Sequence, residues 1–293
     1  MFKKIYFKYF QKKKYFTLKE NIRKKELLLN FSKNLNILEE ISKNLKKKNI
    51  SFLHSGHIGD IICALPLLKY LGKKSKITIY LNHKNSKNFQ GQERMLNYKS
   101  IKMLLPLLKK QKFILKAEVF KNQKIDINLD YFRKLPINFN IDPRKYYGFL
   151  TGLKLNYENK CLILNKIKNS KKKIIIMRSL RRQNPLIDYS FLNTYPNIYY
   201  LGLKDEFEDL KKKIPSLIFY NCKNFLELGI IINSCKIFIG NSSLGFALAE
   251  ALKVTRLLEY DPLHPMIDPI GKKSHVFFHQ KDFENSFKRL YLN

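Results

Sequence analysis

Hydrophobic positions near the start of the chain follow the period of a helix. Residues 20–48 place apolar side chains three and four positions apart, as on one face of a helix. These side chains are Leu27, Phe31, Leu35, Leu38 and Ile41. Neither Gly nor Pro interrupts residues 1–48. The pattern therefore predicts a helical N-terminal extension over residues 1–48.

The pattern changes after residue 49, where short apolar runs alternate with helical periods. Strands are predicted at 51–54, 76–82 and 125–132. Helices are predicted at 60–71, within 95–111 with an interruption near Pro106, and at 145–153. Strands separated by helices are typical of parallel sheets with crossover connections. Residues 49–165 are thus predicted to form a Rossmann-like domain.

A second alternating series follows a Lys-rich linker at 165–173. Its predicted strands are 173–179, 197–203, 216–221, 236–241 and 256–260, and its predicted helices are 205–214, 225–235 and 243–252. The sequence therefore predicts an α/β protein whose second Rossmann-like domain, residues 166–293, faces the first across a cleft. Ligands of such sheets bind beyond the carboxyl ends of the strands, so the chemistry is expected in those loops.

Charge and composition widen the range of partners without selecting one. The chain has 293 residues and a formal net charge of +34, which attracts nucleic acid, acidic lipid headgroups or phosphorylated substrates. A compositional bias toward Lys, Asn and Ile explains the same charge equally well. Four scattered cysteines without a CxxC pair indicate reduced thiols in a cytoplasmic protein. No apolar run reaches the length of a membrane span, and the start lacks the features of a signal peptide.

The aromatic and basic start of the extension has two interpretations. Residues 1–48 could pack on the main body as a helix. Alternatively, residues 1–16 could hold the protein at the anionic inner face of the cytoplasmic membrane, with aromatic side chains in the interface and Lys at the headgroups. The side chains in question are Phe2, Ile5, Tyr6, Phe7, Tyr9 and Phe10.

The first polar loop, HSGHIGD at 54–60, combines two glycines with a carboxylate. Gly56 and Gly59 allow a tight turn and the close approach of a ligand. Asp60 falls where a helix cap is expected, and a cap is the plain structural explanation for it. The spacing matches neither the P-loop nor GxGxxG. Together with His57, the two glycines are candidate contacts for an acceptor substrate.

The second polar loop follows the apolar run 237–240. A helix N-terminus there would offer free N–H groups and a positive dipole end to a phosphate, with hydroxyl donors beside it. The candidate residues are Asn241, Ser242, Ser243, Leu244 and Gly245. An ordinary helix cap is the alternative explanation.

Other candidates follow other strands. Arg178, Arg181 and Arg182 have the fork geometry that suits the oxygens of a diphosphate, although surface charge also explains them. Gly202 and Glu206 are candidate nucleoside contacts, and Asp130 and Arg133 candidate acceptor contacts. For Glu206, stabilisation of a helix dipole by acids in the first turn is the alternative. His54 and His57 lack further ligands nearby, and no Asp-x-Asp occurs, so no metal is expected.

Two of these segments resemble a known family. GDIICALPLLKYL, 59–71, is similar to the first loop and helix of the ADP-heptose:lipopolysaccharide heptosyltransferases, glycosyltransferase family 9, in which Gly-Asp precedes an apolar helix carrying Leu-Pro. Segment 237–254 is similar to their donor-diphosphate loop. It departs from the family pattern, which reads Asp-Thr/Ser-Gly followed by His, because this chain has Asn241, Ser242, Ser243 and, for the His, Phe246.

The resemblance implies a GT-B fold and a metal-independent, inverting glycosyltransferase without a cofactor. Asp60 would be the general base, and a hexosyl or heptosyl group would pass from a nucleotide diphosphate sugar to a hydroxyl group. The acceptor would be a glycan or lipid-linked molecule of the lipopolysaccharide or surface-polysaccharide type. Two other functions stay open: a nucleotide-sugar epimerase-like enzyme on the same fold, and a basic nucleic-acid-binding protein. No known nucleic-acid module supports the latter.

Overall fold

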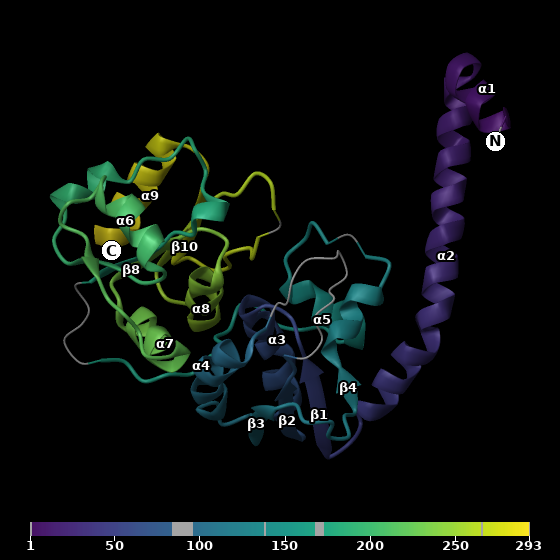
Figure 1. Cartoon of the computed structure of the whole chain (residues 1–293), viewed down its shortest axis with the longest axis horizontal. Coiled ribbons are helices and arrows are strands. Elements are labelled where there is room, and N and C mark those ends of the chain that lie inside the picture. Colours follow the sequence, from purple (N-terminus) through teal and green to yellow (C-terminus); the bar gives the residue numbers. More distant parts are fainter. Residues whose placement is uncertain (1, 84–95, 138, 168–172, 265, 293) are drawn as a thin grey trace.

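Two parallel sheets and a long N-terminal arm make up the protein (Figure 1). The computed structural model describes residues 2–83, 96–137, 139–167, 173–264 and 266–292. All strand pairs in both sheets are parallel, as the alternation of strands and helices predicts.

The first sheet has the order β3-β2-β1-β4. Its strands are β1 (Asn49–His54), β2 (Lys76–Leu81), β3 (Lys116–Val119) and β4 (Ile127–Asn128). The helices of this half are α3 (Ile58–Leu71), α4 (Tyr98–Lys109), α5 (Arg144–Thr151) and the 3-10 helix η1 (Leu129–Lys134). Phe52 on the central strand β1 lies beside Ile79 and Ile127, and all three are buried.

The second sheet has the order β10-β9-β8-β5-β6-β7. Its strands are β5 (Ile174–Met177), β6 (Ile198–Tyr200), β7 (Ile218–Phe219), β8 (Ile237–Gly240), β9 (Arg256–Glu259) and β10 (Ser274–Phe277). Its helices are α6 (Lys204–Lys211), α7 (Phe225–Ser234), α8 (Leu244–Leu252), α9 (Gln280–Leu292) and the 3-10 helices η2 (Leu180–Arg182) and η3 (Ser190–Thr194). Counted within this half, this is the doubly wound order 3-2-1-4-5-6.

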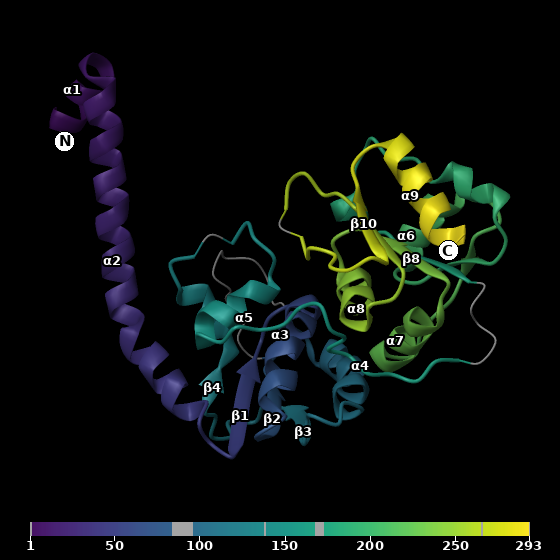
Figure 2. The ribbon, with the colours of Figure 1, turned by 180° about the vertical axis from the view of Figure 1, so that it is seen from behind.

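One hydrophobic core joins the two halves. It contains Leu65 of α3 and Leu248 of α8, because these helices lie against each other between the sheets (Figures 1 and 2). Helices α4 and α7 form a second contact of this kind. A separate core, which includes Phe283, lies between the second sheet and α9. The predicted domain boundary at residues 165 and 166 stays a prediction, and most of the predicted linker lies outside the described residues.

Several predicted elements differ from the structure at their ends. Helices α3 and α4 run through Pro66 and Pro106, so the interruption expected at Pro106 is wrong; buried side chains on both helices hold them in place despite the lost backbone bond. Strand 125–132 is shortened to β4, because the Asn128 side chain accepts from the Asp130 N–H at 2.9 Å and starts η1. Strands β3 and β10 and helix α9 were not predicted.

The arm consists of α1 (Phe2–Phe10) and α2 (Lys12–Asn44), and it leaves the body beside β1 and β4 (Figures 1 and 2). Only the end of α2 packs on the body, where Ile41 and Asn44 are buried and Asn44 Nδ2 donates to the Asp126 carbonyl at 2.7 Å. Only part of the predicted apolar stripe therefore packs on the body, since Leu27 and Leu35 of the same stripe are exposed. No helix in the described residues combines the length and apolar character that crossing a bilayer requires.

Candidate active site

The polar loops lie at two points, one in each sheet, where the strand order reverses. In the first sheet this point lies between β1 and β4, and in the second between β5 and β8. Loops diverge there and leave a crevice at the carboxyl ends of the strands, which is where such sheets bind ligands. The loop after β1 and η1 after β4 carry the predicted acceptor residues. The loops after β5 and β8 carry the predicted diphosphate residues.

Asp60 is the third residue of α3, not the cap residue that its position suggested. His57 caps the helix, and its backbone N–H donates to Asp60 Oδ2 at 3.1 Å. The same Oδ2 accepts from Arg133 Nη2 at 3.2 Å. The Asp60 side chain is 26% exposed, so the carboxylate is oriented by two donors and still reaches the surface.

Arg133 connects the two loops of the first half. Its Nη1 donates to Asp130 Oδ1 at 2.8 Å while its Nη2 holds Asp60. Asp130 is fixed in turn, because the Ser55 backbone N–H donates to its Oδ2 at 3.0 Å and the Ser55 hydroxyl donates to the same oxygen. The structure thus brings the predicted residues Asp60, Asp130 and Arg133 together in one ionic group.

A buried chain of hydrogen bonds holds the backbone of the loop that carries Asp60. The Tyr147 hydroxyl donates to the Asp60 carbonyl at 2.8 Å, so His54 Nε2, also 2.8 Å away, donates to the Tyr147 oxygen. His54 Nδ1 accepts from the Gly56 N–H at 3.0 Å. This pattern requires neutral His54, and burial lowers its pKa accordingly.

The loop at Gly56 is too crowded for a side chain. A Cβ at this position would lie 2.7 Å from Arg133 Nη2 and 2.8 Å from Asp60 Oδ2. A Cβ at Gly59 would meet no atom within 4 Å. The two glycines of the GxxG pattern therefore differ, and only Gly56 is fixed by the ionic group.

Arg178 is buried in the second half, which changes the role expected for it. Its Nε and Nη2 donate to the two oxygens of Glu259 at 2.7 and 2.9 Å. Burial acts to lower the pKa of Arg178, but the hydrogen bonds to Glu259 outweigh it and the pKa is raised. Glu259 at the end of β9 also accepts from the Tyr189 hydroxyl at 2.8 Å. Arg178 thereby fixes the path of the loop after β5.

Arg181 and Arg182 reach the surface of the same loop. Arg181 is exposed and forms no ion pair within the described part of the chain. Arg182 Nη1 lies 3.2 Å from Asp261 Oδ2. The pKa of His57 is lowered by burial and, in part, by the charges of Arg181 and Arg182. These guanidinium groups of the second half therefore lie near the loop that carries Asp60.

Asn241 joins the two loops at the reversal point of the second sheet. Its Oδ1 accepts from the Ser179 N–H at 2.9 Å, and its Nδ2 donates to the Ser179 carbonyl at 2.8 Å. The side chain is fully buried. An amide can make both bonds. The ionised Asp of the heptosyltransferase pattern could not donate to the Ser179 carbonyl, so the two bonds explain why Asn occupies position 241.

Helix α8 begins directly behind Asn241. Ser243 is its cap residue, yet Ser243 Oγ makes no cap bond and, within the described residues, is buried without a hydrogen-bond partner. The N–H groups of the first turn, from Leu244 onward, have no partners inside the helix. A Cβ at Gly245 would lie 2.4 Å from Met177 Sδ, so this glycine lets α8 pack closely on β5. Ser242 lies beside this end, partly exposed.

Gly202 and Glu206 form the turn into α6. Gly202 has φ of +142°, a conformation that favours glycine. Glu206 Oε2 accepts from the Tyr200 hydroxyl at 3.2 Å and from the Leu203 N–H at 3.3 Å. The acid therefore caps its helix as the structural alternative stated, and the same bonds hold it at the carboxyl end of β6.

A cleft of about 480 Å³ opens between the two halves. It is lined by residues 140–142 and 145 of the first half and by residues 260–264, 266 and 268 of the second. Asp142 and Asp261 form ion pairs with Arg144 and Arg182, whereas the Asp268 carboxylate has no ion pair among the described residues. Burial and the charge of Asp142 raise the pKa of Asp268. Asp261 links this cleft to Arg182.

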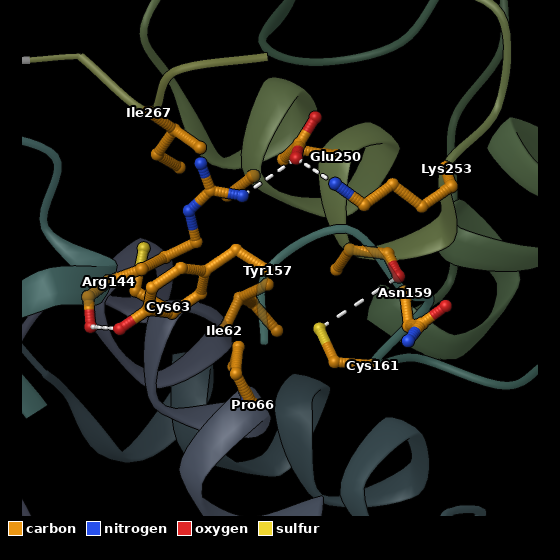
Figure 3. A pocket seen from close by; sticks show the side chains of 12 residues that line it. Ile62, Cys63, Pro66, Arg144, Tyr157, Asn159, Cys161, Glu250, Lys253 and Ile267 are labelled. Atoms are coloured by element: carbon orange, nitrogen blue, oxygen red, sulfur yellow. Dashed lines mark hydrogen bonds and ion pairs between the residues drawn. The ribbon is translucent and has the colours of Figure 1, made fainter. Parts of the chain in front are cut away.

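A buried ionic cluster holds the halves together behind the cleft (Figure 3). Glu250 of α8 accepts from Arg144 Nη1 at 2.7 Å and also from Lys253 and Arg256. Arg144 Nε lies 3.0 Å from both oxygens of Asp142. Since Arg144 begins α5 and Glu250 lies on α8, this cluster crosses the seam between the sheets. The adjoining space, lined by Cys63, Pro66 and Tyr157, holds at most about 10 Å³.

The sequence predictions missed the acids that organise these loops. Glu259 ends β9 and Asp261 lies in the loop after it, and the rule that directed attention to the ends of strands applied to them equally. Glu250 was read only as part of an apolar helix. Across the described residues, no three His, Cys, Asp or Glu side chains are placed to hold a metal ion.

Similarity to known proteins is found in structure alone. No model of a known protein family matches the chain, and no curated protein matches it. A glycosyl transferase family 9 protein from Veillonella parvula is similar with a TM-score of 0.58 at 13% identity, over 85% of this chain and 91% of that protein. E. coli ADP-heptose lps heptosyltransferase II gives 0.56 at 11%, over 83% and 98%.

E. coli heptosyltransferase WaaC, solved with ADP, gives a TM-score of 0.51 at 10% identity, over 83% of this chain and 99% of that protein. At these identities the likeness concerns the fold. The GT-B arrangement of two parallel sheets that the family resemblance implies is thereby confirmed.

Proposed function

We propose that the protein is a metal-independent, inverting glycosyltransferase that uses a nucleotide diphosphate sugar. The observation that carries this proposal is the meeting of two loops from opposite sheets. The loop with Asp60 lies near Arg181 and Arg182, whose charges act on His57. A carboxylate and two guanidinium groups thus lie on neighbouring loops at the positions where this fold binds ligands. That pairing suits removal of a proton on one side and stabilisation of a leaving anion on the other.

The reaction follows from these positions. Asp60 takes the proton of an acceptor hydroxyl while the hydroxyl oxygen forms a bond to the anomeric carbon of the donor. The bond from that carbon to the diphosphate oxygen breaks, and its electron pair leaves with the nucleoside diphosphate. A single displacement inverts the anomeric configuration. Arg133 holds Asp60 in line for this step, and Asp130 holds Arg133.

The donor diphosphate is assigned to the end of α8 and to the loop after β5. Ser243 Oγ, buried without a hydrogen-bond partner among the described residues, provides a donor to phosphate oxygens, since such atoms are rare in folded proteins. The N–H groups of the first turn, at Leu244 and Gly245, provide further donors with Ser242 beside them. Arg181 is assigned to the leaving group, because it is exposed and forms no ion pair with an acid among the described residues. Arg182 assists from its pair with Asp261.

Arg178 and Asn241 position these groups without contacting the donor. Arg178 is held by Glu259, and Asn241 by the Ser179 backbone, so both shape the loops that present Arg181 and Ser243. Gly202 and Glu206, at the end of β6, are assigned to the nucleoside. The turn at Gly202 is exposed, and Glu206 is held beside it by its bonds to Tyr200 and Leu203.

The acceptor is assigned to the crevice at the carboxyl ends of β1 and β4. Gly56, His57 and Gly59 belong to the turn from β1 into α3, and Asp130 and Arg133 of η1 lie beside them. The finer identity of the substrates, a hexosyl or heptosyl donor and a glycan or lipid-linked acceptor of the surface-polysaccharide type, belongs to this proposal. So does a cytoplasmic location at the inner membrane face, for which the N-terminal arm is considered separately below.

A nucleotide-sugar screen tests the proposal. Thermal unfolding of the full chain is measured with ADP-, GDP-, UDP- and CDP-linked sugars, since a ligand of the native state raises the melting temperature. One nucleotide class should stabilise the wild type, and Arg181→Ala should lose this shift. Lys272→Ala, an exposed cation of the same half outside the proposed site, should keep it.

Transfer is then followed as release of the nucleoside diphosphate in the presence of a glycan acceptor mixture. Asp60→Asn should lower the rate at least about a hundredfold, the usual scale for a general base, while retaining the thermal shift. Asp188→Asn, on the surface of the second half, is the control. An unchanged rate in Asp60→Asn contradicts the proposed base. A free sugar or an epimer formed without acceptor indicates an epimerase-like enzyme instead.

A further inference from the structure

The N-terminal arm exposes large apolar side chains over most of its length. Described residues 5–40 include no buried side chain, although α2 alone has 33 residues and extends about 50 Å. On α1, Tyr9 and Phe10 are 68% and 76% exposed, and Phe16 at the start of α2 is 64% exposed. Leu27, Leu28 and Leu29 are each more than half exposed. An isolated helix in water does not normally expose this much apolar surface. We therefore expect the arm to have a partner that covers it.

The apolar residues of α1 lie on one face. Ile5, Tyr6, Tyr9 and Phe10 recur at the spacing of a helical stripe, and the rings of Tyr6 and Phe10 stack with centroids 5.3 Å apart. Tyrosine side chains of this kind, apolar at the ring and polar at the tip, favour the boundary between lipid and water. The stripe on α1 is thus suited to a lipid interface.

Charge distinguishes a membrane from a second copy of the chain. Residues 2–25 contain ten Lys or Arg and one Glu, a concentration of cations that would repel the same segment of another copy. Leu28 and Leu29 lie outside the stripe of Leu27, Phe31 and Leu35, so a single coiled-coil seam would leave them uncovered. An anionic lipid surface attracts the cations and accepts the apolar face of α1, so it fits the charge of the arm better than a second copy does.

We infer that residues 5–33 of the arm dock on an anionic lipid surface, with the aromatic and leucine side chains in the interface and the lysines at the headgroups. The surface is larger than the first sixteen residues, because it includes the exposed part of α2. The arm is fixed to the first half through Ile41 and Asn44, so docking holds that half at the membrane. The inference depends on the arm alone and stands or fails independently of the proposed transfer.

Vesicle flotation of the full chain tests the inference. Wild type should float with phosphatidylcholine–phosphatidylglycerol vesicles and much less with pure phosphatidylcholine. A charge-reversed variant, with Lys12, Lys13 and Lys14 replaced by Glu, should lose at least about a hundredfold in partitioning, at about 1 kcal/mol for each Lys near an anionic surface. Tyr9→Ser with Phe10→Ser should lose at least about a hundredfold, since both rings lose their burial in the interface.

Matched substitutions outside the arm control for total charge and exposed apolar area. Lys272, Lys273 and Lys281, exposed in the second half, are replaced by Glu in one control, and Leu292, 79% exposed, by Ser in another. Both should float like wild type. Equal losses in arm and control variants would overturn the inference, as would no flotation of wild type. It is also overturned if sedimentation shows a dimer that the arm variants abolish, or if the arm binds DNA and not vesicles.

Discussion

Asp60 and Arg133 come from different loops of the first sheet, and the Asp60 Oδ2 lies 3.2 Å from Arg133 Nη2. The pair is partly exposed, so its contribution to folding is small, about 1 kcal/mol or less. Its geometric effect is larger, because Arg133 also binds Asp130 and thereby fixes the direction of the Asp60 carboxylate. An oriented carboxylate at the end of β1 is the structural basis of the proposed proton transfer.

Replacing Arg133 by Lys tests this orientation. Lys keeps the charge but has one nitrogen, so it cannot hold Asp60 and Asp130 in the same fork. Nucleoside diphosphate release should fall at least about tenfold, with the thermal shift by the donor unchanged, since misplacement of a catalytic group is costly. Lys134→Arg next to it should behave as wild type. Equal kcat in Arg133→Lys and wild type would show that the fork is dispensable.

Gly56 and Gly59 offer a matched pair of substitutions. Gly56→Ala places a methyl group 2.7 Å from Arg133 Nη2 and should displace the guanidinium, lowering both the transfer rate and the melting temperature. Gly59→Ala, which meets no atom within 4 Å and lies in the first turn of α3, should be neutral or stabilising by up to about 1 kcal/mol. Urea unfolding of the two variants provides the comparison. The reverse order of stability would contradict the described loop.

Glu250 is the centre of the ionic cluster at the seam. Glu250→Gln removes the charge that compensates Lys253 and Arg256 and one of the two acids that bind Arg144, which leaves the Arg256 guanidinium buried without its acidic partner. The free energy of unfolding should fall by about 3–5 kcal/mol. Glu208→Gln, on the exposed side of α6, should change it by less than about 0.5 kcal/mol. Chemical denaturation with both variants decides the matter, and similar midpoints would argue against a stabilising cluster.

Asn241→Asp converts the residue to the acid of the heptosyltransferase pattern. The carboxylate keeps an acceptor for the Ser179 N–H but faces the Ser179 carbonyl without a hydrogen to donate. A loss of about 1–3 kcal/mol in unfolding free energy is expected. Asn221→Asp, an exposed site, is the control. If Asn241→Asp is as stable as wild type, the amide is not required for the loop.

Stability should fall on acidification because of the buried histidine. Burial lowers the pKa of His54 below its ordinary value near 6.5, so below that pH the unfolded chain binds a proton that the folded chain does not. The stabilisation is fully present above pH 6.5 and decreases as pH falls toward the folded pKa, by at most about 1.4 kcal/mol per pH unit. His54→Gln should flatten this dependence between pH 7 and 5, whereas exposed His279→Gln should not.

The sequence was informative wherever apolar period and position along a strand determine the structure. Both series of strands and helices, their parallel pairing and the loops that carry Asp60, Arg181 and Ser243 follow from such local patterns. The role of Arg178 could not be predicted, because its partner Glu259 is 81 residues away in the sequence and only the order of the second sheet brings them together. The short strand β3 has too few apolar residues for its pattern to be recognised.

The helical period of the arm also could not predict which of its apolar residues pack on the body. Leu27, Phe31 and Leu35 have the same spacing as Leu38 and Ile41, yet only the latter two pack on the body. Helical periodicity reports that a face is apolar and does not report how far the surface that covers it extends.

The strand orders contain a topological repeat. The first sheet, β3-β2-β1-β4, has the same arrangement as the β7-β6-β5-β8 part of the second, so β1 corresponds to β5 and β4 to β8. Pseudo-equivalent loops therefore carry opposite chemistry: Asp60 follows β1, and Arg181 and Arg182 follow β5. One architectural unit, used twice with different loops, thus places the Asp60 carboxylate on one wall of the crevice and the Arg181 and Arg182 guanidinium groups on the other. Such a division lets each wall change its specificity without altering the frame of the other.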